Sequence, residues 1–550
     1  MSIARLSLRS KRSSRRLKKP LLALGVLLVS SLTTWAIITD LGLVRRLHLP
    51  AADEHGDQLT FLTLVSNGQA DEAFDLAFET GDELFETRFN AIDGVGANVG
   101  DGQRFTRVPR ADLRGRGEWA NHVPSRATGP NAEACNACHS EPGDDGAGLA
   151  AANVHRDPNH TGNLGSFIQR NTPHLFSAGS VQRLAEEMTQ TLQGIRQRAI
   201  DSICSQGGSI TVDLAAKGVS FGRITVTRTN SRPCTTSVDT SGVRGVNADL
   251  VIRPFQWKGS VAFLRDFNRG ASHNELGMQA VELVGDGVDG DSDGVVNEMT
   301  IGDQTALAVY VASQPRPTTL IELDSLGLVD PPLTLDQKSQ IERGRNTFSS
   351  IGCATCHVPR LLIERPIFSE PSQDPNYRDA RFPGGQDPLA VGVDPSNPIT
   401  FDLTADQPDN QIPGPNGTTI HLGSLKTDDR GRGIVELFGD LKRHDLGPGL
   451  AERIDEVGTG ASVFLTENLW GVGTSAPYLH DGRATTLTEA ILEHGGEAIG
   501  SRQAFEALSL GRQRDLIAFL QNLVLFKTVQ PAALHVQNPL GSSDLTLAAE

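Results

Sequence analysis

Apolar residues recur at helical spacing in several separate stretches of the chain. Within residues 73–89 they are Phe74, Phe78, Leu84 and Phe85, and a second stripe consists of Val181, Leu184, Met188, Leu192 and Ile195. This spacing predicts amphipathic helices. Further helices are predicted at residues 335–348, at 488–495 and in the closing segment after the candidate N-cap Ser509.

A different pattern occupies residues 208–253, where short runs alternate apolar and polar residues between glycine and Asn-Ser turns. A period of two predicts strands, so we expect a small β insertion at residues 204–253. Residues 93–129 and 365–432 are rich in glycine and proline, which predicts loops. The predicted fold class is therefore mainly α, with a small β insertion and long loops.

The sequence Cys-x-x-Cys-His occurs twice, at residues 135–139 and 353–357. With six cysteines and 14 histidines, roughly 0.002 matches are expected by chance. This motif attaches c-type haem: Cys135, Cys138, Cys353 and Cys356 would bond the porphyrins, and His139 and His357 would bind the irons. A zinc site is the alternative, but each pair carries its own histidine and the pairs lie far apart. Two covalent c-type haems are predicted.

Two cysteines remain, Cys204 and Cys234. Because c-type haem is attached outside the cytoplasm, where disulfides persist, we predict that they form one. Two unpaired buried thiols are the alternative.

The first twenty residues carry eight Lys or Arg and no acid, and an apolar run follows at residues 21–38. This is the pattern of an export signal or membrane anchor, assigned to residues 1–45, which places the rest of the chain in the periplasm. The run is at the lower limit for a span and no cleavage-like site follows, which favours an uncleaved anchor over a removed peptide. Membrane contact is expected only through this segment.

The formal net charge is −16, even with the basic N-terminus included. An acidic body argues against nucleic acid and favours a basic redox partner or a neutral substrate.

Other side chains are candidates for metal or haem chemistry. His155, His160 and His174 are possible distal groups of the first haem, although a structural or surface role is the alternative for each. Asp289, Asp291 and Asp293 alternate before Gly294, like the start of an EF-hand calcium loop. Thr300 stands where that loop needs a glutamate, so a solvated acidic turn is the alternative to calcium.

Together, the two haem motifs, the RHDLGPG run at 443–449 and the APYLHDG run at 476–482 resemble the di-haem c-type peroxidase superfamily. It includes bacterial di-haem cytochrome c peroxidases, the di-haem enzyme that matures tryptophan tryptophylquinone, and rubber oxygenases. The resemblance implies two cytochrome-c-like domains facing each other, at residues 70–315 and 333–530, before a polar tail at 531–550. It also implies a tryptophan between the haems. Trp257 is the candidate, and a buried core tryptophan is its alternative.

The reaction implied is the reduction of hydrogen peroxide at the N-terminal haem, with electrons relayed by the C-terminal haem. Glu275 lies nearest the place of the family's acid/base glutamate, with a solvated helix acid as the alternative. Phe267 stands where many of these proteins have glutamine. An apolar residue there suits dioxygen, so an oxygen-activating dioxygenase resembling rubber oxygenases is the second hypothesis. An electron-transfer cytochrome is the third. The expected electron donor is a small redox protein or a quinol-linked donor.

The second haem is predicted to be bis-histidine, bound by His357 and His494. The peroxidases usually supply a methionine from the helix after the APYLHDG run, but no methionine follows Met299 in this chain. His494 occupies that helix; a helix-surface histidine, with the iron bound by tyrosine or water, is the alternative. Two imidazoles stabilise ferric iron, which predicts a low-potential haem.

Overall fold

The protein is described by a computed structural model at residues 51, 55–95, 131–143, 145–156, 168–290, 294–413, 418–526 and 536–541. The predicted N-terminal segment 1–45 and most of the predicted tail 531–550 lie outside these residues. Within them, helices are the larger share and the sheets are small, so the mainly α class with a small β part is confirmed. The facing arrangement of two haem domains stays a prediction.

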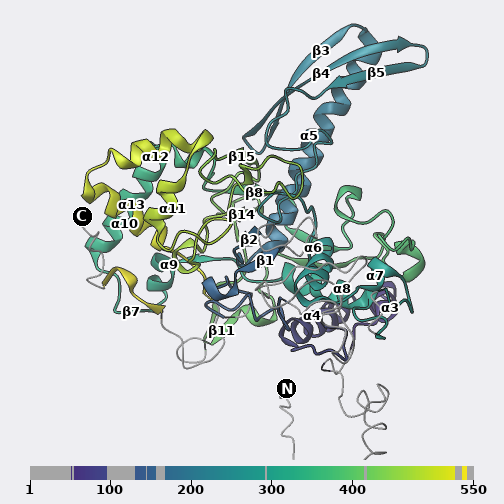
Figure 1. Cartoon of the computed structure of the whole chain (residues 1–550), viewed down its shortest axis with the longest axis horizontal. Coiled ribbons are helices and arrows are strands. Elements are labelled where there is room, and N and C mark those ends of the chain that lie inside the picture. The colour runs from purple at the N-terminus through teal and green to yellow at the C-terminus, as the bar shows by residue number, and fades with distance from the viewer. Residues whose placement is uncertain are drawn as a thin grey trace, which may run out of the picture. The chain divides into compact units, whose positions relative to one another are not determined.

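The first hydrophobic core is built on five helices: α3 (Gln58–Ser66), α4 (Ala70–Glu86), α5 (Ala178–Gln206), α6 (Leu264–Ala271) and α8 (Ile301–Ala312). The apolar stripe of α4 is buried against α8, which is buried along its whole length (Figure 1). Gly81 permits this contact, because a Cβ atom there would lie 2.3 Å from the carbonyl oxygen of Ala306. A capping box between Thr300 and Asp303 begins α8.

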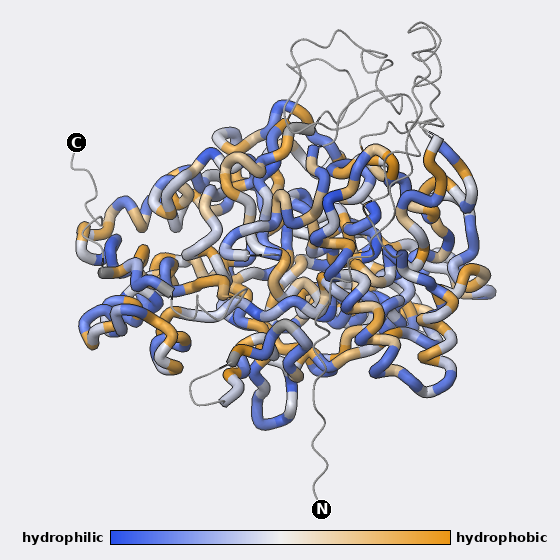
Figure 2. Tube along the Cα trace, turned by 90° about the horizontal axis from the view of Figure 1, so that it is seen from below, coloured by the Kyte–Doolittle hydropathy of each residue, from blue (hydrophilic) through white to orange (hydrophobic). Residues whose placement is uncertain are grey.

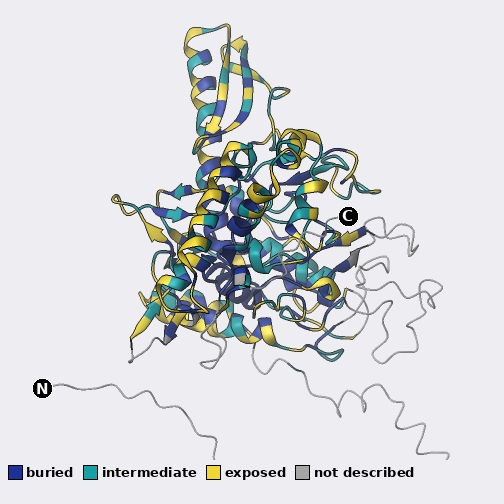
Figure 3. Cartoon of the chain, turned by 90° about the vertical axis from the view of Figure 1, so that its left-hand side faces the viewer, coloured by how far each residue is buried: buried dark blue, intermediate teal, exposed yellow. Residues whose placement is uncertain are grey.

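An arm extends from this core, formed by the C-terminal half of α5 and an antiparallel sheet (Figure 1). Its strands are β3 (Ser209–Ala216), β4 (Val219–Ser231) and β5 (Cys234–Asp239), in that order. The sheet buries apolar residues such as Phe221 and Val226 in the first core, and its remaining positions are mostly half-buried or exposed (Figure 3). The disulfide between Cys204 and Cys234 is present, which confirms that prediction.

Residues 361–441 contain short strands, several of which pack in the first core, whereas the sequence predicted one long loop with a strand or two at 365–432. They are β8 (Leu361–Ile363), β9 (Ile367–Glu370), β10 (Ile399–Asp402), β11 (Gln411–Pro413), β12 (Thr419–His421), β13 (Lys426–Thr427) and β14 (Gly433–Val435). Buried side chains including Phe368, Tyr377 and Phe401 join the core of α4 and α8. Strands this short have too few residues for a period to be recognised.

A second core lies among α9 (Leu320–Ser325), α10 (Leu335–Ser350), α11 (Leu487–Glu493), α12 (Ile499–Glu506) and α13 (Leu510–Gln521). Helices α10 and α13 pack closely (Figure 1). Their contact requires Gly344, because a Cβ atom there would lie 1.9 Å from the carbonyl oxygen of Asp515. Ser509 caps α13 as predicted.

The remaining elements are short. They are α7 (Val281–Val284), β1 (Val154–Arg156), β2 (Ile168–Arg170), β6 (Thr318–Thr319), β7 (Val329–Asp330), β15 (Arg443–Asp445), β16 (Val463–Leu465), β17 (Leu523–Val524), β18 (Val536–Gln537) and the π-helical turn η3 (Ser272–Leu276). Residues 50–550 form one compact unit, and the predicted domain boundaries within it stay predictions.

Polar and apolar residues alternate over short distances along the described chain (Figure 2). None of the helices in the described ranges has the length and apolar character needed to cross a membrane.

Candidate functional site

The first haem motif lies in the wall of a cavity of about 230 Å³. The amides of Cys138 and His139 both donate to the carbonyl of Cys135, which forms a tight turn. The turn directs Cys135, Cys138 and His139 to the same cavity. The rest of the wall is largely apolar and includes Phe85, Phe176, Leu264, Phe267, Leu307 and Val311.

The ring of His139 is oriented and neutral, as an iron ligand must be. Its Nδ1 lies 3.2 Å from the carbonyl oxygen of Gly146, so Nδ1 carries the proton and Nε2 keeps its lone pair. Burial lowers the pKa of His139 to about 4, so the ring is neutral at neutral pH. A neutral imidazole held by a backbone carbonyl fits the predicted iron ligand.

Among the distal candidates, His174 reaches the first cavity. Its Nε2 lies 2.9 Å from the carbonyl oxygen of Trp470, and its Nδ1 is buried without a hydrogen-bond partner in the described part of the chain. Burial also lowers the pKa of His174 to about 4. The side chain of His155 and all of His160 lie outside the described residues.

Glu275 and Phe267 line the same cavity as His139. Glu275 belongs to the π-helical turn η3, a geometry frequent at functional sites. Its Oε2 accepts a 2.7 Å hydrogen bond from Asn131 Nδ2, and its carbonyl accepts the amides of Asn131 and Ala132 just before the motif. Phe267 packs beside Phe255, with ring centres 6.0 Å apart. Their assigned roles stay predictions.

The second motif lines a cavity of about 420 Å³ that contains Cys353, Cys356, His357 and His494. Helix α10 leads into this motif, and α11 ends beside the cavity. The predicted helix 488–495 ends at Glu493, so His494 is its C-cap residue instead of lying inside the helix.

His357 and His494 face each other, with ring centres 6.4 Å apart and planes inclined at 60°. Their Nδ1 atoms lie 3.2 Å from the Phe438 carbonyl and 2.7 Å from the Ala490 carbonyl, so both Nε2 atoms keep a lone pair. Two imidazoles that bind one metal from opposite sides, at about 2 Å each, have ring centres about 6 Å apart. The pair therefore fits a bis-histidine haem, and the ligation itself stays a prediction.

Burial keeps this pair neutral. It lowers the pKa of His357 to about 4, with a further contribution from His494, and it lowers the pKa of His494 as well.

The two cavities share a wall made of Trp257, Leu465, Thr466 and Glu467. Trp257 donates from Nε1 to the carbonyl of Asn171 at 2.9 Å, and its own carbonyl accepts the amide of Leu465. Burial raises the pKa of Glu467 to about 7. Sequence reasoning singled out Trp257 but missed Glu467, because no motif surrounds it.

Buried charges next to this wall were also missed. Lys258, which is fully buried, donates to the carbonyls of Gly460 and Val463 and lies 3.5 Å from Glu452. Glu452 is also paired with Arg170. Such pairs join segments far apart in sequence, so local pattern contains no signal for them.

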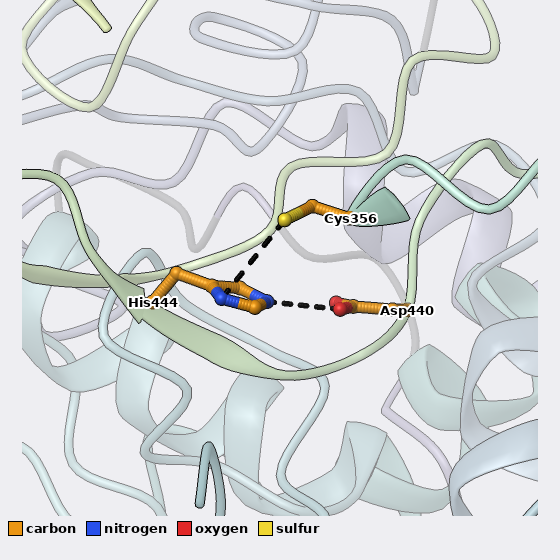
Figure 4. Close-up of side chains that lie close together, drawn as sticks. All are labelled: Cys356, Asp440 and His444. Atoms are coloured by element: carbon orange, nitrogen blue, oxygen red, sulfur yellow. Dashed lines mark hydrogen bonds and ion pairs between the residues drawn. The ribbon is translucent and has the colours of Figure 1, made fainter. Parts of the chain in front are cut away.

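Cys356, Asp440 and His444 form a cluster at the second cavity (Figure 4). Both ring nitrogens of His444 are engaged: Nε2 lies 2.9 Å from Asp440, and Nδ1 lies 2.8 Å from Glu497. Burial opposes the charge, but the hydrogen bond to Asp440 outweighs it and raises the pKa of His444 to about 10. A protonated imidazole has no lone pair for a metal, so we interpret the cluster as part of the haem site's wall.

The predicted calcium turn is described only in part. Asp289 Oδ2 accepts the amide of Gly294 at 2.9 Å, while Asp291 and Asp293 lie outside the described residues. Calcium binding stays a prediction.

Comparison with known proteins agrees with the sequence motifs. Residues 429–523 match the family described as "Di-haem oxidoreductase, putative peroxidase". This stretch contains both the RHDLGPG and APYLHDG runs and His494. The predicted resemblance to the di-haem c-type peroxidase superfamily is therefore confirmed over these residues.

Among solved structures, the chain is similar to one titled "Crystal structure of a MauG-like protein associated with microbial copper homeostasis". The two are 16% identical over 51% of this chain and 72% of that chain, with a TM-score of 0.25. No curated protein matches the chain.

Proposed function

We propose that the chain is a di-haem c-type oxidoreductase that reduces hydrogen peroxide at its N-terminal haem, with electrons relayed by the C-terminal haem. The observation that carries this proposal is the pair of cavities. Each contains its own Cys-x-x-Cys-His motif, and Trp257 belongs to the wall between them.

Four cysteines would hold the haems, and His139, His357 and His494 would bind the irons. When bound, the haems supply one-electron storage and an iron at which oxygen species react. Nδ1 hydrogen bonds to backbone carbonyls orient all three rings. The first cavity also contains a second imidazole, that of His174, but its Nε2 lies 2.9 Å from the Trp470 carbonyl. In the second cavity the rings of His357 and His494 lie 6.4 Å apart, the spacing of two ligands of one iron, so we assign electron storage to the second cavity and peroxide reduction to the first.

Within the first cavity, Glu275 is placed to move the proton that cleavage of the oxygen–oxygen bond requires. The Asn131 amide holds one of its carboxylate oxygens, and the surrounding apolar wall limits water. Phe267 adds no hydrogen-bonding group to this wall.

A dioxygenase is the second candidate, favoured by Phe267 and the apolar lining of the first cavity. A cavity with few polar groups binds dioxygen or an apolar substrate without leaving hydrogen-bond partners unpaired.

We also propose that the chain is exported to the periplasm, held to the membrane through residues 21–38, and reduced by a small redox protein or a quinol-linked donor. The basic N-terminus and the acidic remainder support this proposal.

The test is rapid mixing of half-reduced protein with hydrogen peroxide and, separately, with dioxygen. A fast absorption change with peroxide alone is the expected result, and a change with dioxygen alone would favour the dioxygenase. EPR that finds only six-coordinate low-spin haem, unable to bind cyanide, would contradict both enzymes and leave an electron-transfer cytochrome.

A further inference from the structure

Tyr310 is fully buried in α8, on a different face of the helix from the one that lines the first cavity. Its neighbours Leu307 and Val311 line that cavity, whereas Tyr310 packs on Phe78 and Phe85 of α4. Its hydroxyl donates to Asp145 Oδ2 at 3.0 Å. Asp145 is itself fully buried and belongs to the loop that follows the first haem motif. A phenol is thus held against a carboxylate inside the core.

An aromatic path connects this phenol to the predicted ligand of the first haem. The ring of Phe85 lies 6.2 Å from that of His139 and 5.4 Å from that of Tyr310. Phe85 also lines the first cavity. Tyr310 is therefore two ring-to-ring steps from His139, through the buried ring of Phe85.

The hydroxyl of Tyr310 differs from that of the other fully buried tyrosine. Tyr377 donates to the carbonyl of Ile252 at 2.7 Å and pairs with the hydroxyl of Thr189. A carbonyl or hydroxyl does not accept a full proton near neutral pH, but a carboxylate does. Burial and the adjacent carboxylates raise the pKa of Tyr310 well above its usual range, so the phenol retains its proton until it is oxidised.

We propose that Tyr310 is a redox-active tyrosine that serves the first haem. When hydrogen peroxide oxidises a haem held by His139, Tyr310 would give up one electron to that site through Phe85. The O–H bond breaks, its proton moves to the carboxylate of Asp145, and a neutral tyrosyl radical remains. This step rests on the proposed peroxide reaction, and it stores an oxidising equivalent in the core, away from the cavity.

The test is freeze-quench EPR of the di-haem protein after mixing with hydrogen peroxide. We expect an organic radical whose hyperfine pattern narrows in protein grown with ring-deuterated tyrosine. Tyr310→Phe should lose the signal, and the matched control Tyr377→Phe should keep it. A signal that survives in Tyr310→Phe, or one unchanged by deuteration, would overturn the proposal.

A second variant tests the same step if Tyr310→Phe does not fold. Asp145 has a left-handed φ of 65°, which asparagine tolerates, so Asp145→Asn preserves the backbone and an oxygen that accepts from the phenol. The amide cannot take up the proton. Asp82 is a second carboxylate that interacts with the phenol, so Asp145→Asn is combined with Asp82→Asn. The double variant should bind both haems and lose the tyrosyl signal; a radical of wild-type yield and lifetime would contradict proton transfer to these carboxylates.

The peroxide reaction and the oxidation of Tyr310 can be tested separately. If peroxide leaves the absorption of the first haem unchanged, the peroxidase proposal fails. Oxidation by flash-generated tris(bipyridyl)ruthenium(III), which needs no haem chemistry, then tests Tyr310 directly. A radical at Tyr310 under the flash supports its redox role, and a tyrosyl signal absent or located elsewhere would refute it.

Discussion

His139, His357 and His494 share one hydrogen-bonding arrangement. In each, Nδ1 donates to a backbone carbonyl, which leaves Nε2 free of a proton and sets the orientation of the ring. Burial lowers the pKa of all three. Neutral, oriented imidazoles at both cavities are what two iron sites require.

Replacing His494 by alanine should remove the second imidazole from the C-terminal haem. We expect the low-spin spectrum of that haem to be lost and its reduction potential to rise, because a ligand that stabilises ferric iron has gone. EPR and a spectroelectrochemical titration measure both effects. His421→Ala, which changes an exposed histidine, is the matched control. An unchanged spectrum in His494→Ala would show that this residue does not bind the iron.

Glu275→Gln should lower kcat for peroxide reduction by about 10²–10⁴-fold, the usual contribution of a positioned acid/base group. The amide keeps the size of the side chain and a partner for Asn131, so cyanide binding to the first haem should persist. Steady-state kinetics with hydrogen peroxide measure the loss. Glu72→Gln, on the exposed face of α4, should behave as wild type. Equal kcat in both variants would rule out the acid/base role.

At the level of elements, the two haem motifs are positioned by different supports. The first follows α4 and is anchored by carbonyl contacts to η3, whereas the second lies at the end of α10, where Phe348 packs 6.3 Å from the ring of His357. The arm of α5 and β3–β5 carries none of the proposed haem ligands, which lie elsewhere in the chain. Its disulfide is therefore expected to affect stability and not redox chemistry.

The double substitution Cys204→Ser and Cys234→Ser tests this separation. The bond closes a loop of sequence separation 30, for which chain entropy predicts a loss of about 3–4 kcal/mol in stability. Thermal unfolding and limited proteolysis of the arm report the loss, and both haem spectra should stay unchanged. Identical melting of variant and wild type without reductant would contradict it.

Across the whole molecule, the two cavities meet at Trp257, and the two hydrophobic cores meet near Arg316. Arg316 donates from Nη2 to Glu322 of α9 at 2.6 Å, and its Nε donates to the carbonyl of Ser424. Substitution of Trp257 therefore tests electron transfer between the two sites, and substitution of Glu322 tests how far its pairing with Arg316 stabilises the fold.

Trp257→Phe should slow electron equilibration between the haems while each haem keeps its own spectrum. Phenylalanine fills most of the space but loses the indole N–H that anchors the ring to Asn171. Stopped-flow reduction monitored at both haems measures the rate. The control is Trp470→Phe, because Trp470 lines only the first of the two haem cavities. An unchanged rate in Trp257→Phe would remove its role as a bridge.

Stability should depend on pH through Glu322. Burial opposes its charge, but hydrogen bonds from Arg316 outweigh burial and lower its pKa to about 2, from 4.5 in the unfolded chain. A lowered carboxyl pKa stabilises the fold above about pH 4.5, and this contribution is lost as pH falls toward 2. Urea unfolding of wild type and Glu322→Gln should differ most near neutral pH and converge in acid. A difference that stays constant with pH would contradict this.

Much of this arrangement could be predicted from local sequence. Helices α4, α5 and α13 were predicted because apolar residues recur at helical spacing within each. The Cys-x-x-Cys-His motifs are contiguous, so their chemistry could be read without a fold. The partner of Cys204 was predicted by counting cysteines, and the structure confirms it.

Other features were missed for identifiable reasons. The strands between residues 361 and 441 are too short to show a period, and the burial of β10 and β9 depends on contact with α4 and α8. Glu467 and Lys258 have ordinary sequence neighbours, so nothing marked them as buried beside the cavities. The end of α11 at Glu493 likewise depends on the geometry of its last turn.

The sequence by itself determined the helical class and predicted two haems, because both depend on contiguous or periodic residues. The pairing of His357 with His494 was predicted from the family resemblance and from the lack of a methionine after Met299. Only the tertiary structure decided that Trp257 and Glu467 share a wall between two cavities, and that Tyr310 is held against Asp145. Such walls and contacts join segments hundreds of residues apart, and side-chain burial there arises from packing, which no local pattern of residues records.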